Sequence, residues 1–317
     1  MNKKHFLKGG KDAASFEKKV VIAVSSRALF DLEKENDIFI NKGMEAYYEY
    51  QVRNESKILK PGGGFPLVKA LLNFGSTHKE RHRQKESLIE VIIVSKNSPE
   101  AGIRIFNSIN HYKLDITRAA FLGGESPANY LGAFNADLYL SKESENVKEA
   151  LKNKIASAKI SDLQREGVNP EEIEKKSLSE IRIAFDADKV VFSDESEKIF
   201  EKSGAEAFYK YEQERAKKNL ADGPFARFVR ALASIKAVYP MGKCPIKLAI
   251  VTARNSPAHE RVLRTLRAWR VDLDKAFFLG GLSKADILQR FKPHIFFDDK
   301  KENVESSSKN SPSGLVG

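Results

Sequence analysis

The sequence predicts an α/β protein in which short buried strands alternate with helices and the whole unit occurs twice. Three observations predict this fold. Short apolar runs have the composition of buried strands, amphipathic stretches lie between them, and the chain contains an internal repeat. Such alternation is typical of parallel sheets with helices on both faces. We therefore expect two parallel sheets of this kind, each with a helical cap insertion.

The repeat sets the expected organisation of the chain. At a shift of 161 positions, residues 22–71 align with 183–232 without a gap, and fifteen of the fifty pairs are identical. Unrelated stretches of ordinary composition would give about three. Further on the shift drops to 157, and "AAFLGGESPANYL" aligns with "AFFLGGLSKADIL". We expect a flexible N-terminal tail at 1–19, a first repeat at 20–145, a helical connector at 146–179, a second repeat at 180–300 and a polar C-terminal tail at 301–317.

The second repeat shows its elements most clearly. Strands are predicted at 181–185, 246–253, 275–279 and 294–297, and helices at 259–269 and 283–291. The first of these helices places Val262, Leu266 and Trp269 on one face. Between the first two strands, residues 194–243 have a helical pattern and the size of a small cap inserted after the first strand.

Polar residues follow each of these strands. Ligands of open α/β sheets bind at the carboxyl ends of the strands, so these residues are expected to lie together. The set comprises Asp186 and Asp188 after the first strand, Thr252 and Arg254 after the second, Lys284 after the third, and Asp298 and Asp299 after the fourth.

These residue types suit phosphoryl transfer. Several carboxylates around one point bind a hard divalent cation, and Mg²⁺ prefers such all-oxygen ligands. Asp186 is placed to attack phosphorus and form an aspartyl-phosphate, with Asp188 as the acid and later the base. Thr252 and Lys284 are expected to bind phosphoryl oxygens. Arg254 has two interpretations, a phosphate or ribose contact and a surface salt bridge.

The first repeat lacks this chemistry. Its aligned positions are Ser25, Arg27, Ser95, Pro127, Ser141 and Lys142. Every acidic position is lost while the apolar pattern remains, so we expect this repeat to bind no Mg²⁺ and to catalyse nothing. It is expected to act as a structural partner. The sequence leaves open whether it also contributes to a substrate pocket.

The composition and charge of the chain limit the kinds of partner that we expect it to bind. The 317 residues include 54 Lys and Arg and 43 Asp and Glu, a net charge of +11. The basic residues are interleaved with acids, which favours a small anionic substrate over nucleic acid. The start has no apolar signal core and no apolar run reaches the length of a membrane span, so we expect a cytoplasmic protein without a membrane partner. Cys244 is the single cysteine and is expected to be a buried hydrophobe. The oligomeric state stays open, with a homo-oligomer among the alternatives.

The motifs also carry a family resemblance. "DADKVVF", "VTAR", "SK" and "FFDD" resemble the four motifs of the haloacid dehalogenase superfamily. More closely, "AVSSRALFDLE", "NSINHY", "GGESPANYL", "FSDESE" and "KPHIFFDD" are similar, in the same order, to stretches of the cytosolic 5′-nucleotidase type I family. The resemblance runs from about Val20 to Asp299. One departure is Ala187, where the first motif would have glycine.

The resemblance implies a Mg²⁺-dependent hydrolase of nucleoside 5′-monophosphates, AMP-like or deoxynucleotide. By position, Asp186 would be the nucleophile and Asp188 the acid and base, and Thr252 and Lys284 would bind phosphate. The metal would be held by a set drawn from Asp186, Asp188, Asp298 and Asp299. The alternatives are a phosphatase of another small ester, a dehalogenase, which would not need the acid Asp188, and a catalytically silent nucleotide-binding protein.

Overall fold

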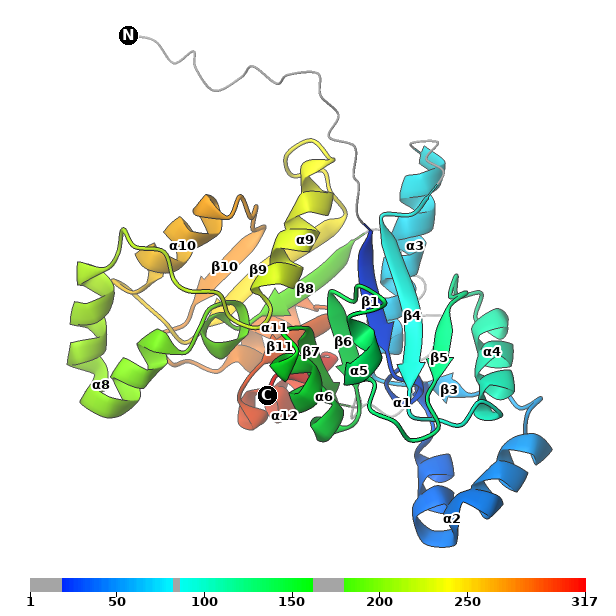
Figure 1. The fold of residues 1–317 in the computed structure, drawn as a ribbon. Coiled ribbons are helices and arrows are strands. Elements are labelled where there is room, and N and C mark those ends of the chain that lie inside the picture. The colour runs from blue at the N-terminus through cyan, green and yellow to red at the C-terminus, as the bar shows by residue number, and fades with distance from the viewer. Residues whose placement is uncertain (1–18, 82–85, 162–179) are drawn as a thin grey trace.

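One large β-sheet organises the computed structural model, which describes residues 19–81, 86–161 and 180–317 (Figure 1). Within these described ranges the sheet has ten strands, in the order β10-β9-β8-β11-β12-β7-β6-β1-β4-β5. From one edge to the other they are β10 (Lys275–Phe278), β9 (Ile246–Thr252), β8 (Ile181–Phe185), β11 (Ile295–Asp298), β12 (Ser313–Leu315), β7 (Ala156–Ile160), β6 (Leu138–Ser141), β1 (Val20–Val24), β4 (Ile89–Ser95) and β5 (Ala119–Phe121).

The sheet consists of two five-stranded halves with the same strand order. All neighbouring strands are parallel except β12 and β7, which pair antiparallel where the halves meet. The predicted α/β architecture is confirmed, and each strand predicted in the second half forms within one or two residues of its expected bounds. The expectation of two separate sheets is wrong, because the halves share one mostly parallel sheet.

Helices cover both faces of the sheet, as predicted. On one face, a single apolar cluster spans both halves and includes residues of α3 (Phe65–Arg81), α4 (Ala101–His111), α9 (Ala226–Ala237) and α10 (His259–Ala268). Smaller clusters lie under α5 (Ala128–Leu131) and α6 (Ser144–Lys152) in the first half and under α11 (Lys284–Phe291) in the second. Val262 and Leu266 of α10 are buried as expected, and so is Cys244.

Two long helices stand away from the sheet at opposite ends of the molecule, α2 (Glu33–Arg53) and α8 (Glu195–Glu214) (Figure 1). Each follows the first strand of its half. Each is kinked at a glycine in nearly the same conformation, Gly43 at φ 81° and ψ −177° and Gly204 at φ 78° and ψ −177°. Short elements lead into these helices: α1 (Ser26–Leu29) and β2 (Phe30–Asp31), which pairs with β3 (Lys60–Pro61), and the helical turn η1 (Ala187–Val191).

The C-terminal segment differs from the expected polar tail. Residues 301–317 form α12 (Lys301–Ser308) and then β12, which completes the sheet by pairing with both β11 and β7. Ser311 and Ser313 are buried, at 1% and 0% exposure. The connector starts in the same way, with α6 and then β7, while its remainder at 162–179 and the N-terminal residues 1–18 lie outside the described residues.

The strand register brings the carboxyl ends of both halves to the junction. Ser141 pairs with Lys159, Lys159 with Leu315, and Leu315 with Asp298, so these residues form one row across four strands. At about 4.8 Å per strand, Ser141 and Asp298 lie about 14 Å apart. Among the helices of the described ranges, none combines the length and the apolar character needed to cross a membrane.

Candidate active site

Three aspartates gather at the carboxyl ends of β8 and β11. Asp186 directly follows β8, where its backbone N–H donates to the carbonyl of Phe297 at 2.8 Å, and Asp298 ends β11. One carboxylate oxygen from each of Asp186, Asp298 and Asp299 lies within 4.8 Å of the others. Asp186 is 6% exposed and Asp298 is fully buried. The structure therefore brings together three of the four predicted metal ligands.

Lys284 compensates two of these charges. Its Nζ lies 2.8 Å from Asp186 Oδ1 and 2.7 Å from Asp298 Oδ2. It begins α11, and Ser283 caps that helix by accepting a hydrogen bond from the backbone N–H of Ala285 at 3.3 Å. The cap therefore fixes the start of the helix that carries Lys284 to the carboxylates.

Asp298 is held rigidly by further donors. The backbone N–H of Lys300 donates to Oδ1 at 2.8 Å, and the amide of Asn303 donates to Oδ1 and Oδ2 at 3.0 and 3.1 Å. Asn303 lies on α12, in the segment expected to be a tail, so sequence reasoning missed it. A signal was available: Glu-Asn-Val occurs at both 145–147 and 302–304, at the same shift of 157.

Burial and crowding raise the pKa values of two of these aspartates. Burial raises the pKa of Asp186 to about 8, against the lowering effect of Lys284, and Asp298 and Asp188 raise it further. Burial, followed by repulsion from Asp298 and Glu197, raises the pKa of Asp299 to about 6. Oδ1 of Asp299 is buried and accepts no hydrogen bond from the described part of the chain. An orphaned oxygen among three crowded carboxylates fits a hard divalent cation.

Asp188 lies in a different environment from Asp186, Asp298 and Asp299. Both of its oxygens accept from Arg254, at 2.8 Å from Nε and 2.6 Å from Nη2. Arg254 Nη1 also pairs with Glu212 at 2.6 Å, and Glu212 is shared with Arg261 at 3.0 Å. Arg254 is only 4% exposed, so its surface-salt-bridge interpretation is wrong. Instead it orients Asp188 from a fully buried anchor, Glu212, which no sequence motif indicated.

Thr252 and Ala187 are two further positions in the sequence motifs of the site. The Thr252 hydroxyl oxygen is buried and accepts from the backbone N–H of Arg254 at 3.2 Å, which leaves its proton free to donate. Ala187 is fully buried and is not among the residues with positive φ, so an alanine satisfies the backbone at this position where glycine was expected. The left-handed conformation falls instead on Lys189, at φ 58°.

The fold and this site define a class: an α/β protein whose strand ends hold a buried carboxylate cluster suited to a divalent cation and a phosphoryl group. Residues 12–317 match the family model described as 5′-nucleotidase. The chain therefore belongs to the 5′-nucleotidase family, and the resemblance seen in the sequence motifs is confirmed.

Among curated proteins, the chain is similar to cytosolic 5′-nucleotidase 1B of Homo sapiens, with 37% identity over 295 residues. The match covers 92% of this chain and 47% of the human protein, so the chain spans about half the length of that relative. Among solved structures, histidinol dehydrogenase from Elizabethkingia anophelis matches at 10% identity and a TM-score of 0.21, covering 94% of this chain and 79% of that one. A score this low carries no argument about the fold.

Proposed function

We propose that this chain hydrolyses nucleoside 5′-monophosphates, AMP-like or deoxynucleotide, to nucleoside and phosphate. The observation that carries the proposal is the cluster of Asp186, Asp298, Asp299 and Lys284 at the strand ends of a 5′-nucleotidase family member. The human relative is named a cytosolic enzyme, and we propose the cytoplasm for this chain as well.

Asp186 is the proposed nucleophile. Its carboxylate oxygen attacks phosphorus, the bond to the ribose 5′-oxygen breaks, and an aspartyl-phosphate forms. Lys284, 2.8 Å from Asp186, lies where it can neutralise the transferring group, and the Thr252 hydroxyl donates to a phosphoryl oxygen. Because the pKa of Asp186 is raised by burial, positive charge beside it also favours the ionised form that attacks.

Asp188 is the proposed general acid and base. It protonates the leaving 5′-oxygen and then takes a proton from the water that hydrolyses the aspartyl-phosphate. Each oxygen of Asp188 accepts one bond from Arg254 and keeps a second lone pair for the proton that is transferred. Arg254, held by Glu212, keeps the carboxylate in the same place for the two steps.

Mg²⁺ is the cation proposed for this site, with Asp186, Asp298 and Asp299 as the residues that would hold it. When bound, it supplies positive charge that offsets the phosphoryl oxygens during transfer. The fourth predicted ligand, Asp188, has its side chain committed to Arg254, so its role as a metal ligand stays a prediction.

We further propose that the two halves are copies of one haloacid-dehalogenase-like unit, of which only the second is catalytic. The common strand order, the matched glycine kinks and the repeated sequence support this proposal. The proposed units are 20–145 and 180–300, extended by β7 in the first half and by α12 and β12 in the second.

Phosphate release from a panel of nucleoside monophosphates, with Mg²⁺ and with EDTA, tests the proposal. We expect release from one or more nucleotides that requires Mg²⁺. Cleavage of a generic phosphate ester but of no nucleotide would keep the chemistry and discard the substrate. Release from neither would leave the nucleotide-binding alternative and refute the enzyme.

A further inference from the structure

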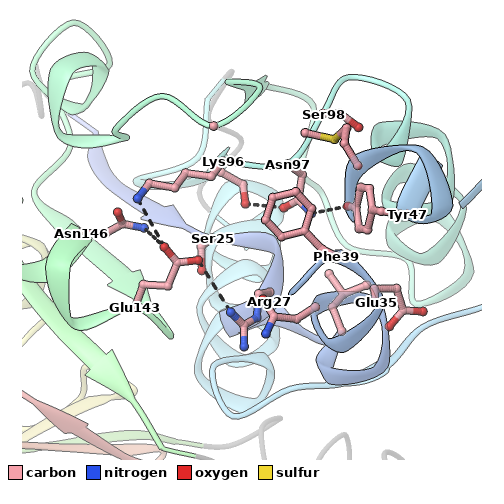
Figure 2. A pocket seen from close by; sticks show the side chains of 15 residues that line it. Ser25, Arg27, Glu35, Phe39, Tyr47, Lys96, Asn97, Ser98, Glu143 and Asn146 are labelled. Atoms are coloured by element: carbon pink, nitrogen blue, oxygen red, sulfur yellow. Dashed lines mark hydrogen bonds and ion pairs between the residues drawn. The ribbon is translucent and has the colours of Figure 1, made fainter. Parts of the chain in front are cut away.

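A cavity of about 350 Å³ lies in the first half, at the carboxyl ends of β1, β4 and β6 (Figure 2). Among the described residues, all those that line it lie between positions 25 and 146, in the first half. Its volume falls in the range of small-molecule sites, which is roughly 300–1,000 Å³. By the sequence repeat, Ser25, Arg27 and Ser95 of this cavity align with Asp186, Asp188 and Thr252.

The polar wall of the cavity is held by its own hydrogen bonds. Ser95 Oγ donates to Asn97 Oδ1 at 2.6 Å, and Asn97 Nδ2 donates to the Tyr47 hydroxyl at 2.8 Å. Ser26 also bonds to Asn97 and lies 2.9 Å from Ser95, oxygen to oxygen. These contacts join the end of β4 to α1 and α2, so the wall is preorganised rather than assembled by a ligand.

Two cations and several polar side chains line the cavity. Arg27 and Lys96 converge on Glu143, at 3.7 and 3.5 Å, and Asn146 donates to the same carboxylate at 3.0 Å (Figure 2). Arg27 Nε, Ser98 Oγ and Asn146 Oδ1 are buried and have no hydrogen-bond partner within the described ranges. Asn146 is only 2% exposed. All three atoms belong to residues that line the cavity, and a buried group without a partner costs free energy that a bound ligand would recover by bonding to it.

Another part of the lining is aromatic and apolar. Phe39 lies edge-on to Tyr47, with ring centroids 5.9 Å apart at 79°. Phe39 and Met44 remain 45% and 53% exposed although both line the cavity. An exposed ring beside polar groups suits a planar base, which can stack on it while its edge finds hydrogen-bond partners.

We propose that this cavity is a second nucleotide site, one that binds its ligand without hydrolysing it. The base would lie against Phe39 and Met44, and the phosphate would take the place of Glu143 beside Arg27 and Lys96. Hydrolysis is excluded because Ser25, Ser141 and Lys142 stand at the positions of the three clustered aspartates. The proposed function supports only the choice of a nucleotide as the ligand; the site itself rests on the cavity.

Calorimetric titration with AMP in EDTA tests the site without turnover. The pocket variant Arg27→Gln/Lys96→Gln is compared with the control Lys42→Gln/Lys57→Gln, which removes the same charge from exposed positions outside the cavity. We expect the pocket variant to lose one AMP site or weaken it by about 10- to 100-fold, because charge-assisted bonds to phosphate are lost. The control should bind as the parent does.

The outcome is independent of catalysis. The proposal is supported if the pocket variant loses AMP binding and the control does not. This holds whether the parent binds AMP at one site or at two, and even if the parent hydrolyses no nucleotide. Identical isotherms for the pocket variant and the control would overturn it, and so would the absence of AMP binding by the parent at millimolar concentration. Thermal unfolding of both variants shows whether the loss reflects binding rather than folding.

Discussion

The two halves of the molecule share a scaffold and differ at the strand ends. Both have five strands in the same order and a long helix kinked at an equivalent glycine. The second half places three carboxylates and a lysine at its strand ends, whereas the first has two serines, a lysine and a proline there and surrounds a cavity instead. The apolar positions therefore carry the fold, and a handful of polar positions decide what each half can do.

The contacts that anchor the long helices are similar in the two halves but not identical. Arg104 in the first half and Arg261 in the second align, and each donates to a backbone carbonyl at an aligned position, Lys57 at 2.9 Å and Lys218 at 2.8 Å. Their acidic partners differ: Arg104 pairs with Glu35, and Arg261 with Glu212. Only Glu212 also binds the arginine that orients Asp188. The second half thus uses a structural ion pair for its site.

Replacing the proposed nucleophile should give the largest contrast between the halves. Asp186→Asn removes the attacking oxygen, so we expect phosphate release to fall by at least about 10³-fold. The fold should not suffer. A buried carboxyl whose pKa is raised to about 8 weakens the folded state near neutral pH, and the amide removes that charge.

Phosphate release and thermal unfolding in EDTA measure the two effects. We expect an unchanged or higher melting temperature for Asp186→Asn. The exposed first-half variant Asp115→Asn serves as the control and should keep full activity. Retained turnover in Asp186→Asn would refute the mechanism, even if the family assignment stands.

The pair Asp298 and Ser141 tests whether cation binding belongs to the second half alone. Asp298→Asn would remove a carboxylate and turn an amide group toward Lys284, Asn303 or the Lys300 N–H, all of which are donors. We expect Mg²⁺ affinity to fall by about 10- to 100-fold, together with a loss of about 1–3 kcal/mol in stability.

Ser141→Ala is the matched change in the first half, where the hydroxyl accepts from the backbone N–H of Glu143 at 3.1 Å. The rise in melting temperature on adding Mg²⁺ provides the measurement. We expect this rise in the parent and in Ser141→Ala, and little of it in Asp298→Asn. An equal rise in all three proteins would place the cation elsewhere.

The sequence predicted the second half well because its signals are local. Strands such as 181–185 and 246–252 are continuous apolar runs, and the acids that follow them stand out. It missed β7 and β12, which are short and rich in small or polar residues and form through pairing across the junction. Glu212 was missed as well, since its role depends on two arginines about forty and fifty residues away. The first-half cavity was missed because it is defined by shape.

The matched kinks test how alike the two long helices are. Gly43 and Gly204 have positive φ with ψ near 180°, a region that is almost restricted to glycine, and a Cβ there would meet no atom within 4 Å. The cost of alanine is therefore backbone strain alone, about 1–3 kcal/mol at each position. We expect Gly43→Ala and Gly204→Ala to lower the free energy of unfolding equally and additively.

Denaturant unfolding of both variants and of the double variant measures this strain. Gly132→Ala is the control, since Gly132 has an α-helical backbone at φ −64° and equally open space, so alanine should be neutral or stabilising there. A loss at only one of the two kinks would show that the helices are not equivalent.

The smallest expected effect on stability comes from one backbone N–H at the start of β1 and β8. The two halves bond this N–H to different side chains. The N–H of Val21 donates to Asp137 at 3.0 Å, and the aligned N–H of Arg182 donates to His294 Nδ1 at 3.1 Å. Burial, helped by the charge of Arg182, lowers the pKa of His294 from 6.5 to about 4. Between these values the unfolded chain binds the proton more readily, so the folded state loses stability as pH falls.

We expect this histidine to cost about 2 kcal/mol between pH 7 and pH 5. His294→Asn keeps an acceptor for Arg182 and cannot titrate, so its free energy of unfolding should fall by that much less over the same range. Denaturant unfolding at both pH values provides the comparison, with the exposed His111→Asn as a control that keeps the parent's dependence. If His294→Asn loses as much stability as the parent, this histidine is not the source of the loss. The crowded carboxylates would not explain it either, because the raised pKa values of Asp186 and Asp299 favour the folded state as pH falls.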